Sequence, residues 1–239
     1  MIKKLWLIFL ILILSGFSAG LTKDQLELVA PGGGELDLGR NVMVYHGTAT
    51  KPVEVRWQSL ILNSKYLEYN RNNETLFAKS QAQITQKLPF RTLKANEISV
   101  KLKQESLAAN GGVSLKYDDT TTVTCNMLKW DQKNDLMELS GQPIVIYKEW
   151  TIKGVRMEGH PQKGLFIVYG PAEAANKTSL ARGGKMTFDR DADKLVIQEN
   201  PDLVRGKNEM SANEIVYDLK TNQVLASGTV KTRIVEETE

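Results

Sequence analysis

The stretch "LKANEISVKLKQESLAANGGVSLKYDD", residues 93–119, decides the fold. Apolar and polar residues alternate along it, a charged turn interrupts them, and the alternation then resumes around paired glycines. A nearly matching stretch, "MSANEIVYDLKTNQVLASGTVKTRIVE", stands at residues 210–236. Both contain Ala-Asn-Glu-Ile, a polar turn and an Ala-x-Gly-x-Val ending in the same order. Such a recurrence indicates a repeat protein.

Six copies align on the residue that closes the first half of each copy, which is aromatic or apolar in all copies except the one with Gly159: Tyr69, Val100, Trp130, Gly159, Phe188 and Tyr217. Their successive spacings are 31, 30, 29, 29 and 29 residues. Two residues earlier the position is always apolar: Leu67, Ile98, Leu128, Met157, Met186 and Ile215. Five residues earlier it is always small: Ser64, Ala95, Cys125, Gly154, Gly183 and Ala212. Eleven residues later it is small in all copies but one: Ser80, Gly111, Gly141, Gly170, Glu199 and Gly228.

Apolar residues within each half-repeat are two positions apart, which places them on one face of a β-strand. Polar turn-formers separate the halves, at residues 70–75, 101–106, 131–136, 160–165, 189–194 and 218–223. Each repeat is therefore predicted to be a hairpin of two short antiparallel strands. One hairpin cannot bury its own apolar face, so stacked copies must share an interior. The small residue before each anchor breaks the alternation and predicts a corner or bulge between sheets.

The ends of the chain carry a different signal. Lys3 and Lys4 precede an apolar run that ends at Leu14, and small residues follow, as in a cleaved secretory signal peptide over residues 1–20. A retained single-pass anchor is the alternative, although the run is about half the length of a membrane span. Residues 21–35 are expected to be a flexible leader, residues 36–235 a single β domain, and residues 236–239 a frayed tail.

Composition argues against catalysis and against nucleic-acid binding. The chain has 239 residues with a formal net charge of +3, a balance ordinary for a globular protein. Its only cysteine is Cys125, at a small-residue position expected to be inert, and only two histidines, His46 and His160, are present. Three aspartates in "FDRDADK" lack the glycine and glutamate of a calcium loop and are expected at a solvated hairpin tip. We therefore expect no enzyme, no metal and no cofactor.

The pattern small-x-x-apolar-x-aromatic, polar turn, apolar-x-Ala-x-Gly-x-Val resembles the OstA/LptA family of lipopolysaccharide-transport proteins over roughly residues 42–232. The resemblance implies an all-β fold, an open twisted antiparallel β-jellyroll (a β-taco) of about six two-stranded repeats, each about 30 residues long. It also implies a periplasmic, non-catalytic module that shields the acyl chains of lipopolysaccharide or a related glycolipid in an apolar groove, as part of a bridge from inner to outer membrane. Implied partners are other lipopolysaccharide-transport proteins, joined through edge strands, and further copies of the chain in an end-to-end homo-oligomer. An inner-membrane-anchored relative of the LptC type and a paralogue for another lipid stay open.

The apolar positions that recur in every repeat favour, taken alone, a sealed core, whereas the resemblance implies that some of them line the groove. The candidate lining residues are Tyr69, Ile98, Trp130, Met157, Met186, Phe188 and Tyr217. A hypothesis from another class is a secreted β-solenoid that binds polysaccharide or acts as an adhesin scaffold. The last strand, residues 223–237, keeps its alternation through Val235, which predicts an edge open to a partner.

Overall fold

A computed structural model describes residues 26–87 and 89–235 of the chain. Within them 22 strands form one continuous antiparallel sheet, and a single short 3₁₀ helix, η1 (Pro161–Lys163), lies at a hairpin tip. The predicted all-β antiparallel fold is confirmed. No helix in this part of the chain is long and apolar enough to cross a membrane. The predicted signal peptide and the predicted frayed tail lie outside the described residues.

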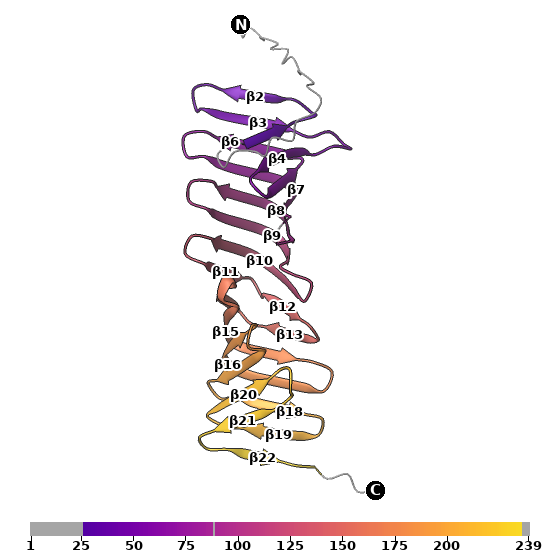
Figure 1. Cartoon of the computed structure of the whole chain (residues 1–239), viewed down its shortest axis with the longest axis vertical. Helices are drawn as coiled ribbons and strands as arrows, with labels where there is room; N and C mark the ends of the chain where they lie inside the picture. The colour runs from indigo at the N-terminus through magenta and orange to yellow at the C-terminus, as the bar shows by residue number, and fades with distance from the viewer. Residues whose placement is uncertain (1–25, 88, 236–239) are drawn as a thin grey trace.

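The sheet folds over on itself into two layers, and successive repeats stack along the long axis of the molecule (Figure 1). Layer A contains β2 (Gly34–Asp37), β3 (Val42–His46), β6 (Tyr66–Asn70), β11 (Leu136–Ser140), β14 (Arg156–His160), β17 (Lys194–Gln198), β20 (Glu214–Asp218) and β21 (Val224–Ser227). Layer B contains β1 (Leu26–Val29), β4 (Val53–Trp57), β5 (Leu60–Ser64), β12 (Ile144–Tyr147), β13 (Trp150–Lys153), β18 (Asp202–Arg205), β19 (Asn208–Ser211) and β22 (Lys231–Arg233). Six longer strands bend and contribute to both layers: β7 (Thr75–Gln86), β8 (Arg91–Lys101), β9 (Ser106–Lys116), β10 (Thr121–Asp131), β15 (Leu165–Ala175) and β16 (Ser179–Asp189).

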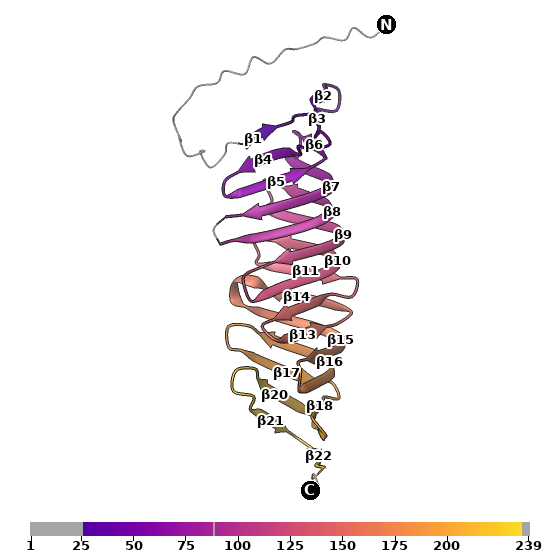
Figure 2. The same cartoon turned by 90° about the vertical axis from the view of Figure 1, so that its right-hand side faces the viewer.

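Layer A carries a hairpin at each of the six predicted turns: β6–β7, β8–β9, β10–β11, β14–β15, β16–β17 and β20–β21. The hairpin tips are bonded to one another along the stack. The Leu102 amide donates to the Glu74 carbonyl at 3.0 Å, and the Arg190 amide donates to the Gly164 carbonyl at 2.8 Å. The tips therefore form a continuous edge along the stack, and Figure 2 shows the same stack from the right-hand side of Figure 1.

The predicted corners lie on the opposite side, where the chain passes between layers. The register of β8 shifts between Lys94 and Glu97, and that of β10 shifts between Cys125 and Met127. At the facing corner position Gly111 has φ +76°, and a Cβ there would lie 2.8 Å from Asn96 Nδ2. In three copies, at Asn96, Asn126 and Asn213, the asparagine that follows the small residue therefore occupies the space that a side chain at the facing glycine would need.

The apolar columns of the repeat lie in the interior between the layers. The column two residues before the anchor has no accessible surface in any copy: Leu67, Ile98, Leu128, Met157, Met186 and Ile215 are each 0% exposed. The one anchor that is neither aromatic nor apolar, Gly159, faces Phe166 across β14 and β15. A Cβ on Gly159 would lie 2.1 Å from Phe166 Cδ1, so the ring fills the place of the missing side chain.

Two expectations about the ends differ from the structure. Residues 21–35 are expected to be a flexible leader; residues 21–25 lie outside the described residues, but in the rest β1 pairs with β4, and Leu26 and Leu28 pack against the core. A four-residue strand is too short to show a clear period, and its partner strand stabilises it. The last strand is also divided, because the chain turns at Gly228 (φ +82°) and continues as β22 in layer B.

Candidate functional site

The two layers are continuous with each other at the corners. On the opposite side the margins of the two layers face each other, and we call this side the mouth. There the hairpin tips of layer A approach the strand ends and loops of layer B. The mouth differs between the two halves of the molecule: near repeats two and three it contains an apolar cavity, and farther along the chain it is bridged by polar contacts.

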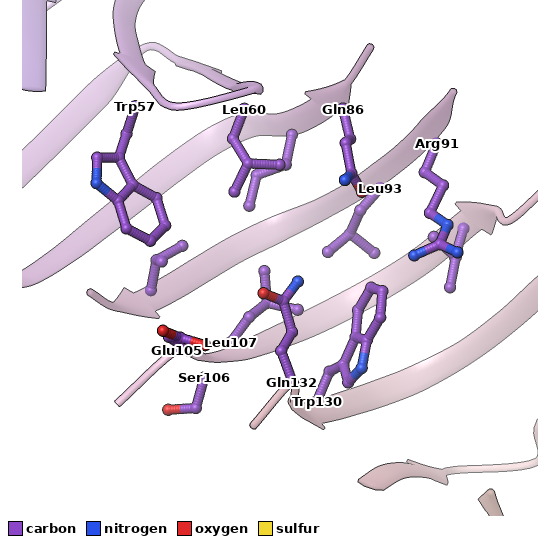
Figure 3. Close-up of a pocket in the computed structure, with 13 residues that line it drawn as sticks. Trp57, Leu60, Gln86, Arg91, Leu93, Glu105, Ser106, Leu107, Trp130 and Gln132 are labelled. Carbon is purple, nitrogen blue, oxygen red and sulfur yellow. The ribbon is translucent and has the colours of Figure 1, made fainter. Parts of the chain in front are cut away.

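The cavity, here called the apolar opening, is a cleft between the layers whose space of about 540 Å³ is largely open to solvent or too narrow for a water molecule (Figure 3). Its walls are apolar and come from both layers: Trp57, Leu60, Ile84, Leu93, Val100, Leu107, Leu115 and Trp130. Its margin is polar, with Gln86 and Arg91 on one side and Glu105 and Gln132 of the hairpin tips on the other. A small number of polar groups around an apolar wall is the usual composition of a small-molecule site.

A second, much smaller apolar space lies beside the opening toward the N-terminal end of the stack. The two spaces share Trp57, Leu60, Ile84 and Val100 as lining residues. The lining of the second space adds Val55, Leu62, Leu76 and Leu102, all apolar. An elongated apolar ligand that enters between the layers at the opening would thus meet apolar side chains for a further distance along the interior.

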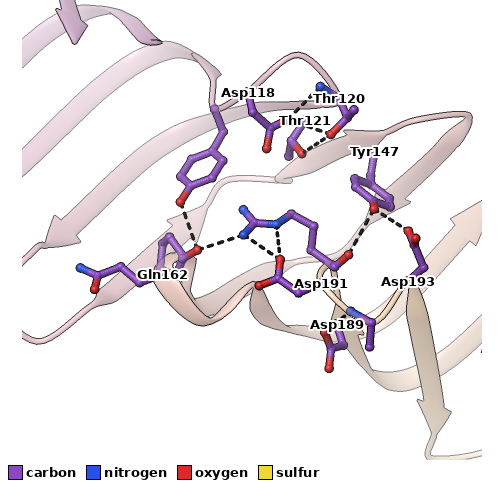
Figure 4. A network of polar contacts seen from close by, with 12 residues as sticks. Asp118, Thr120, Thr121, Tyr147, Gln162, Asp189, Asp191 and Asp193 are labelled. Atoms are coloured by element: carbon purple, nitrogen blue, oxygen red, sulfur yellow. Dashed lines mark hydrogen bonds and ion pairs between the residues drawn. The ribbon is translucent and has the colours of Figure 1, made fainter. Parts of the chain in front are cut away.

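Beyond the opening the mouth is closed by a set of interlayer contacts that we call the clasp. The Tyr117 hydroxyl donates to the Pro161 carbonyl at 3.1 Å. The Tyr147 hydroxyl lies 2.5 Å from Asp193 Oδ1 and 3.2 Å from the Arg190 carbonyl. Figure 4 shows Tyr147 of layer B pointing at Asp193 on the hairpin tip of layer A.

The charged part of the clasp is the contact of Lys148 Nζ with Asp193 Oδ1, at 2.6 Å. The hydrogen bonds from Lys148 and Tyr147 hold the pKa of the Asp193 carboxyl below its ordinary value. One repeat farther on, the Ser179 and Tyr217 hydroxyls are 3.1 Å apart, and Tyr217 donates to Asn222 Oδ1. The clasp therefore joins the layers at successive levels of the stack.

Aromatic side chains pack beneath the clasp and fill the interior. The Tyr147 and Phe188 ring centroids are 5.0 Å apart, and Trp150 meets Tyr217 edge to face at the same distance. Trp150 is 1% exposed and Tyr217 is 0% exposed. Packing of this kind leaves the half of the molecule beneath the clasp as a closed hydrophobic core.

The seven candidate lining residues fall into different environments. Ile98, Met157, Met186 and Tyr217 have no accessible surface, and Phe188 is 1% exposed. Tyr69 is partly buried against the core. Trp130, 8% exposed, is the one member of the set that lines the apolar opening. Contact of all seven residues with acyl chains stays a prediction, and for the fully buried ones it would require the layers to separate.

The remaining sequence candidates have structural partners. Asp189 accepts from the Ala192 amide, Asp191 pairs with Arg190, and Asp193 belongs to the clasp. In residues 26–87 and 89–235 no group of three or more His, Cys, Asp or Glu side chains is placed to hold a metal ion. Burial raises the pKa of the Cys125 thiol to about 11, which keeps it protonated and unreactive at neutral pH.

Sequence reasoning missed most of the walls of the opening. Trp57 and Leu60 precede the first repeat, and Leu93 stands in the half-strand that belongs to layer B. The alternation Val53, Val55, Trp57 and the inward position of Leu93 were visible signals. What the sequence did not reveal is which inward positions of layer B face open space.

No family model matches the chain, and no curated protein does. A solved structure with some similarity is the crystal structure of LptH, described as the LptA homologous periplasmic component of the conserved lipopolysaccharide transport device from Pseudomonas aeruginosa. The match has 15% sequence identity and a TM-score of 0.30, and it covers 61% of this chain and 95% of LptH. A likeness this distant does not assign a function to the chain.

Proposed function

We propose that this chain is a non-catalytic lipid-binding module, which holds the acyl chains of an amphiphile between its two layers at the apolar opening. The observation that carries the proposal is the apolar opening itself, with its apolar walls, polar margin and continuation into the interior. Transfer of each methylene group from water into such a site stabilises a complex by about 0.8 kcal/mol. A saturated chain of moderate length would therefore bind without any covalent chemistry.

The proposal extends to the kind of lipid and the place of action. The repeat pattern resembles the OstA/LptA family, and we propose lipopolysaccharide or a related glycolipid as ligand and the periplasm as location. The walls of the opening are apolar and its polar residues lie at the margin, which suits carriage more than hydrolysis. Transfer along a bridge between the membranes would follow if like modules join end to end.

The two ends of the stack support such joining. At the N-terminal end β1 and β2 are the edge strands of layers B and A, and they carry Glu27, Glu35 and Asp37. At the C-terminal end the corresponding edge strands are β22, with Lys231 and Arg233, and β21. We propose that the acidic N-terminal edge of one copy pairs with the basic C-terminal edge of the next, continuing both layers.

Exposed apolar side chains at these ends fit the same arrangement, since Leu225 is 69% exposed, Ile234 71% and Leu36 50%. Light scattering should detect self-association that salt weakens and that Lys231→Glu together with Arg233→Glu abolishes. Equal association of the parent and this double variant would contradict the edge-to-edge arrangement.

Site-specific photo-crosslinking tests lipid binding directly. A photoreactive amino acid placed at Leu107, in the opening, should crosslink to lipopolysaccharide, and the same amino acid at Ile146, 46% exposed, should not. Competition by a deacylated oligosaccharide would favour the polysaccharide-binding scaffold. Equal crosslinking at both positions, or none at Leu107, would refute the proposal.

A further inference from the structure

A polar cavity, distinct from the two apolar spaces, adjoins the apolar opening at the mouth. It encloses about 900 Å³, including space open to solvent, and its lining includes Arg91, Tyr117 and Arg190. The two guanidinium groups lie over the Tyr117 ring, with Arg91 Cζ 4.1 Å and Arg190 Cζ 5.1 Å from its centroid. We call this group the arginine pocket.

The tyrosine holds both cations in place. Its hydroxyl accepts a hydrogen bond from Arg91 Nη2 at 2.8 Å and donates to the Pro161 carbonyl at 3.1 Å. The Tyr117 side chain is 7% exposed, so its ring is a fixed platform for the guanidinium planes. Two arginines with defined positions at a cavity are pre-organised for a phosphate or carboxylate group, which guanidinium binds in a two-pronged geometry.

Hydrogen-bonding capacity remains at both arginines. Arg91 Nε and Arg190 Nη1 are buried and have no hydrogen-bond partner among the described residues. A buried donor without a partner destabilises a protein, and more so when the group is charged.

Two acidic residues, Asp118 and Asp119, also line the arginine pocket, and both have partners. The Asp118 carboxylate accepts from the Thr120 amide and hydroxyl, each at 2.8 Å. Asp119 pairs with Lys116, and Asp191 pairs with Arg190, each at 2.9 Å. Arg91 has no carboxylate within ion-pair distance in the part of the chain that the structure describes, so its charge is available to a ligand.

Arg91 also lines the apolar opening, beside Leu93 and Trp130. The same side chain thus stands where a polar cavity and an apolar one meet, which is the arrangement that an amphiphile with an anionic head requires. We propose that the arginine pocket binds the phosphate or carboxylate group of an amphiphile whose chain occupies the apolar opening. This inference rests on the proposed lipid-binding function and adds the charge of the head group.

The test compares dodecyl phosphate with dodecyl maltoside, which has the same chain and a neutral head, by calorimetry below micelle-forming concentrations. The parent protein should bind dodecyl phosphate more tightly. Arg91→Gln should weaken dodecyl phosphate binding about tenfold, the effect of one hydrogen-bonded charge, and leave dodecyl maltoside binding unchanged. Arg190→Gln is a second variant with the same expectation.

Arg156→Gln is the matched control, because Arg156 lies 4.2 Å from the Tyr169 ring centroid and pairs with Glu158, but lines neither cavity. It should bind both amphiphiles like the parent. Circular dichroism of each variant checks that it is folded.

The other results overturn the inference in distinguishable ways. Equal binding of both amphiphiles, unchanged in Arg91→Gln and Arg190→Gln, would refute the arginine pocket while leaving the lipid-binding function standing. Inorganic phosphate binding as tightly as dodecyl phosphate, and lost in Arg91→Gln, would identify a free-phosphate site and refute the link to the opening. Failure of both amphiphiles to bind the parent would refute the proposed function itself.

Discussion

Replacing Tyr147 by phenylalanine should loosen the clasp without changing the core beneath it. The substitution removes the hydroxyl that lies 2.5 Å from Asp193 Oδ1 and 3.2 Å from the Arg190 carbonyl, and it keeps the ring that packs on Phe188. A hydrogen bond to a charged acceptor contributes about 1.5–3 kcal/mol, and we expect the lower end because the Lys148 contact to Asp193 remains. The free energy of unfolding should therefore fall by about 1.5 kcal/mol.

Urea unfolding measures this loss, and hydrogen exchange locates it. The amides of Arg190 and Leu219, which bond neighbouring hairpin tips, should exchange faster in Tyr147→Phe. Tyr169→Phe is the matched control, since it also removes a hydroxyl that donates to a carboxylate, Glu158, but within one layer. If both variants lose the same stability and neither changes exchange at the tips, the clasp does not hold the layers together.

Three further predictions follow from single residues. The pKa of the Asp193 carboxyl is lowered in the folded protein, so its contribution to stability is present above the unfolded pKa near 3.8 and is lost as the pH falls below that value. The difference in unfolding free energy between the parent and Asp193→Asn should therefore shrink as the pH falls below 3.8. Gly159→Ala should cost about 1–3 kcal/mol by urea unfolding because its Cβ would meet Phe166, whereas Gly39→Ala, where the nearest atom is 3.4 Å away, should change little. Cys125, with a thiol pKa of about 11, should react slowly with a maleimide at pH 7.5 until the protein is unfolded, and fast labelling of the native protein would contradict its burial.

The alternation and the spacing of small residues were sufficient to predict the hairpins of layer A and the corners, but the repeats are not simply two-stranded, because β12, β13, β18 and β19 of layer B were not predicted. An asparagine and a glycine carry this information in three repeats, because Asn96, Asn126 and Asn213 pack into the space that side chains at Gly111, Gly141 and Gly228 would need. Gly159 departs from the anchor pattern, and only the facing Phe166 explains it. Such features can be predicted from the sequence because they depend only on contacts between neighbouring strands.

The site was less predictable because burial along a repeat depends on how far the two layers separate. Trp130 and Tyr217 occupy the same anchor position of the repeat, yet Tyr217 is sealed in the core and Trp130 borders a cavity. Arg91 stands before the alternating run of its strand, and nothing in its sequence context shows that it meets Tyr117 and Arg190. Contacts across the mouth join residues far apart in the chain, so the periodic pattern of the sequence does not predict them.

The dependence of affinity on chain length tests the central claim most directly. Calorimetry of alkyl maltosides from eight to twelve carbons should show affinity rising about fourfold for each added methylene, the effect of about 0.8 kcal/mol per group. Leu107→Gln, in the wall of the opening, should reduce this slope, and Leu225→Gln, on the exposed terminal strand, should not. An affinity that does not vary with chain length, or a slope that both variants change equally, would contradict binding of the chain between the two layers.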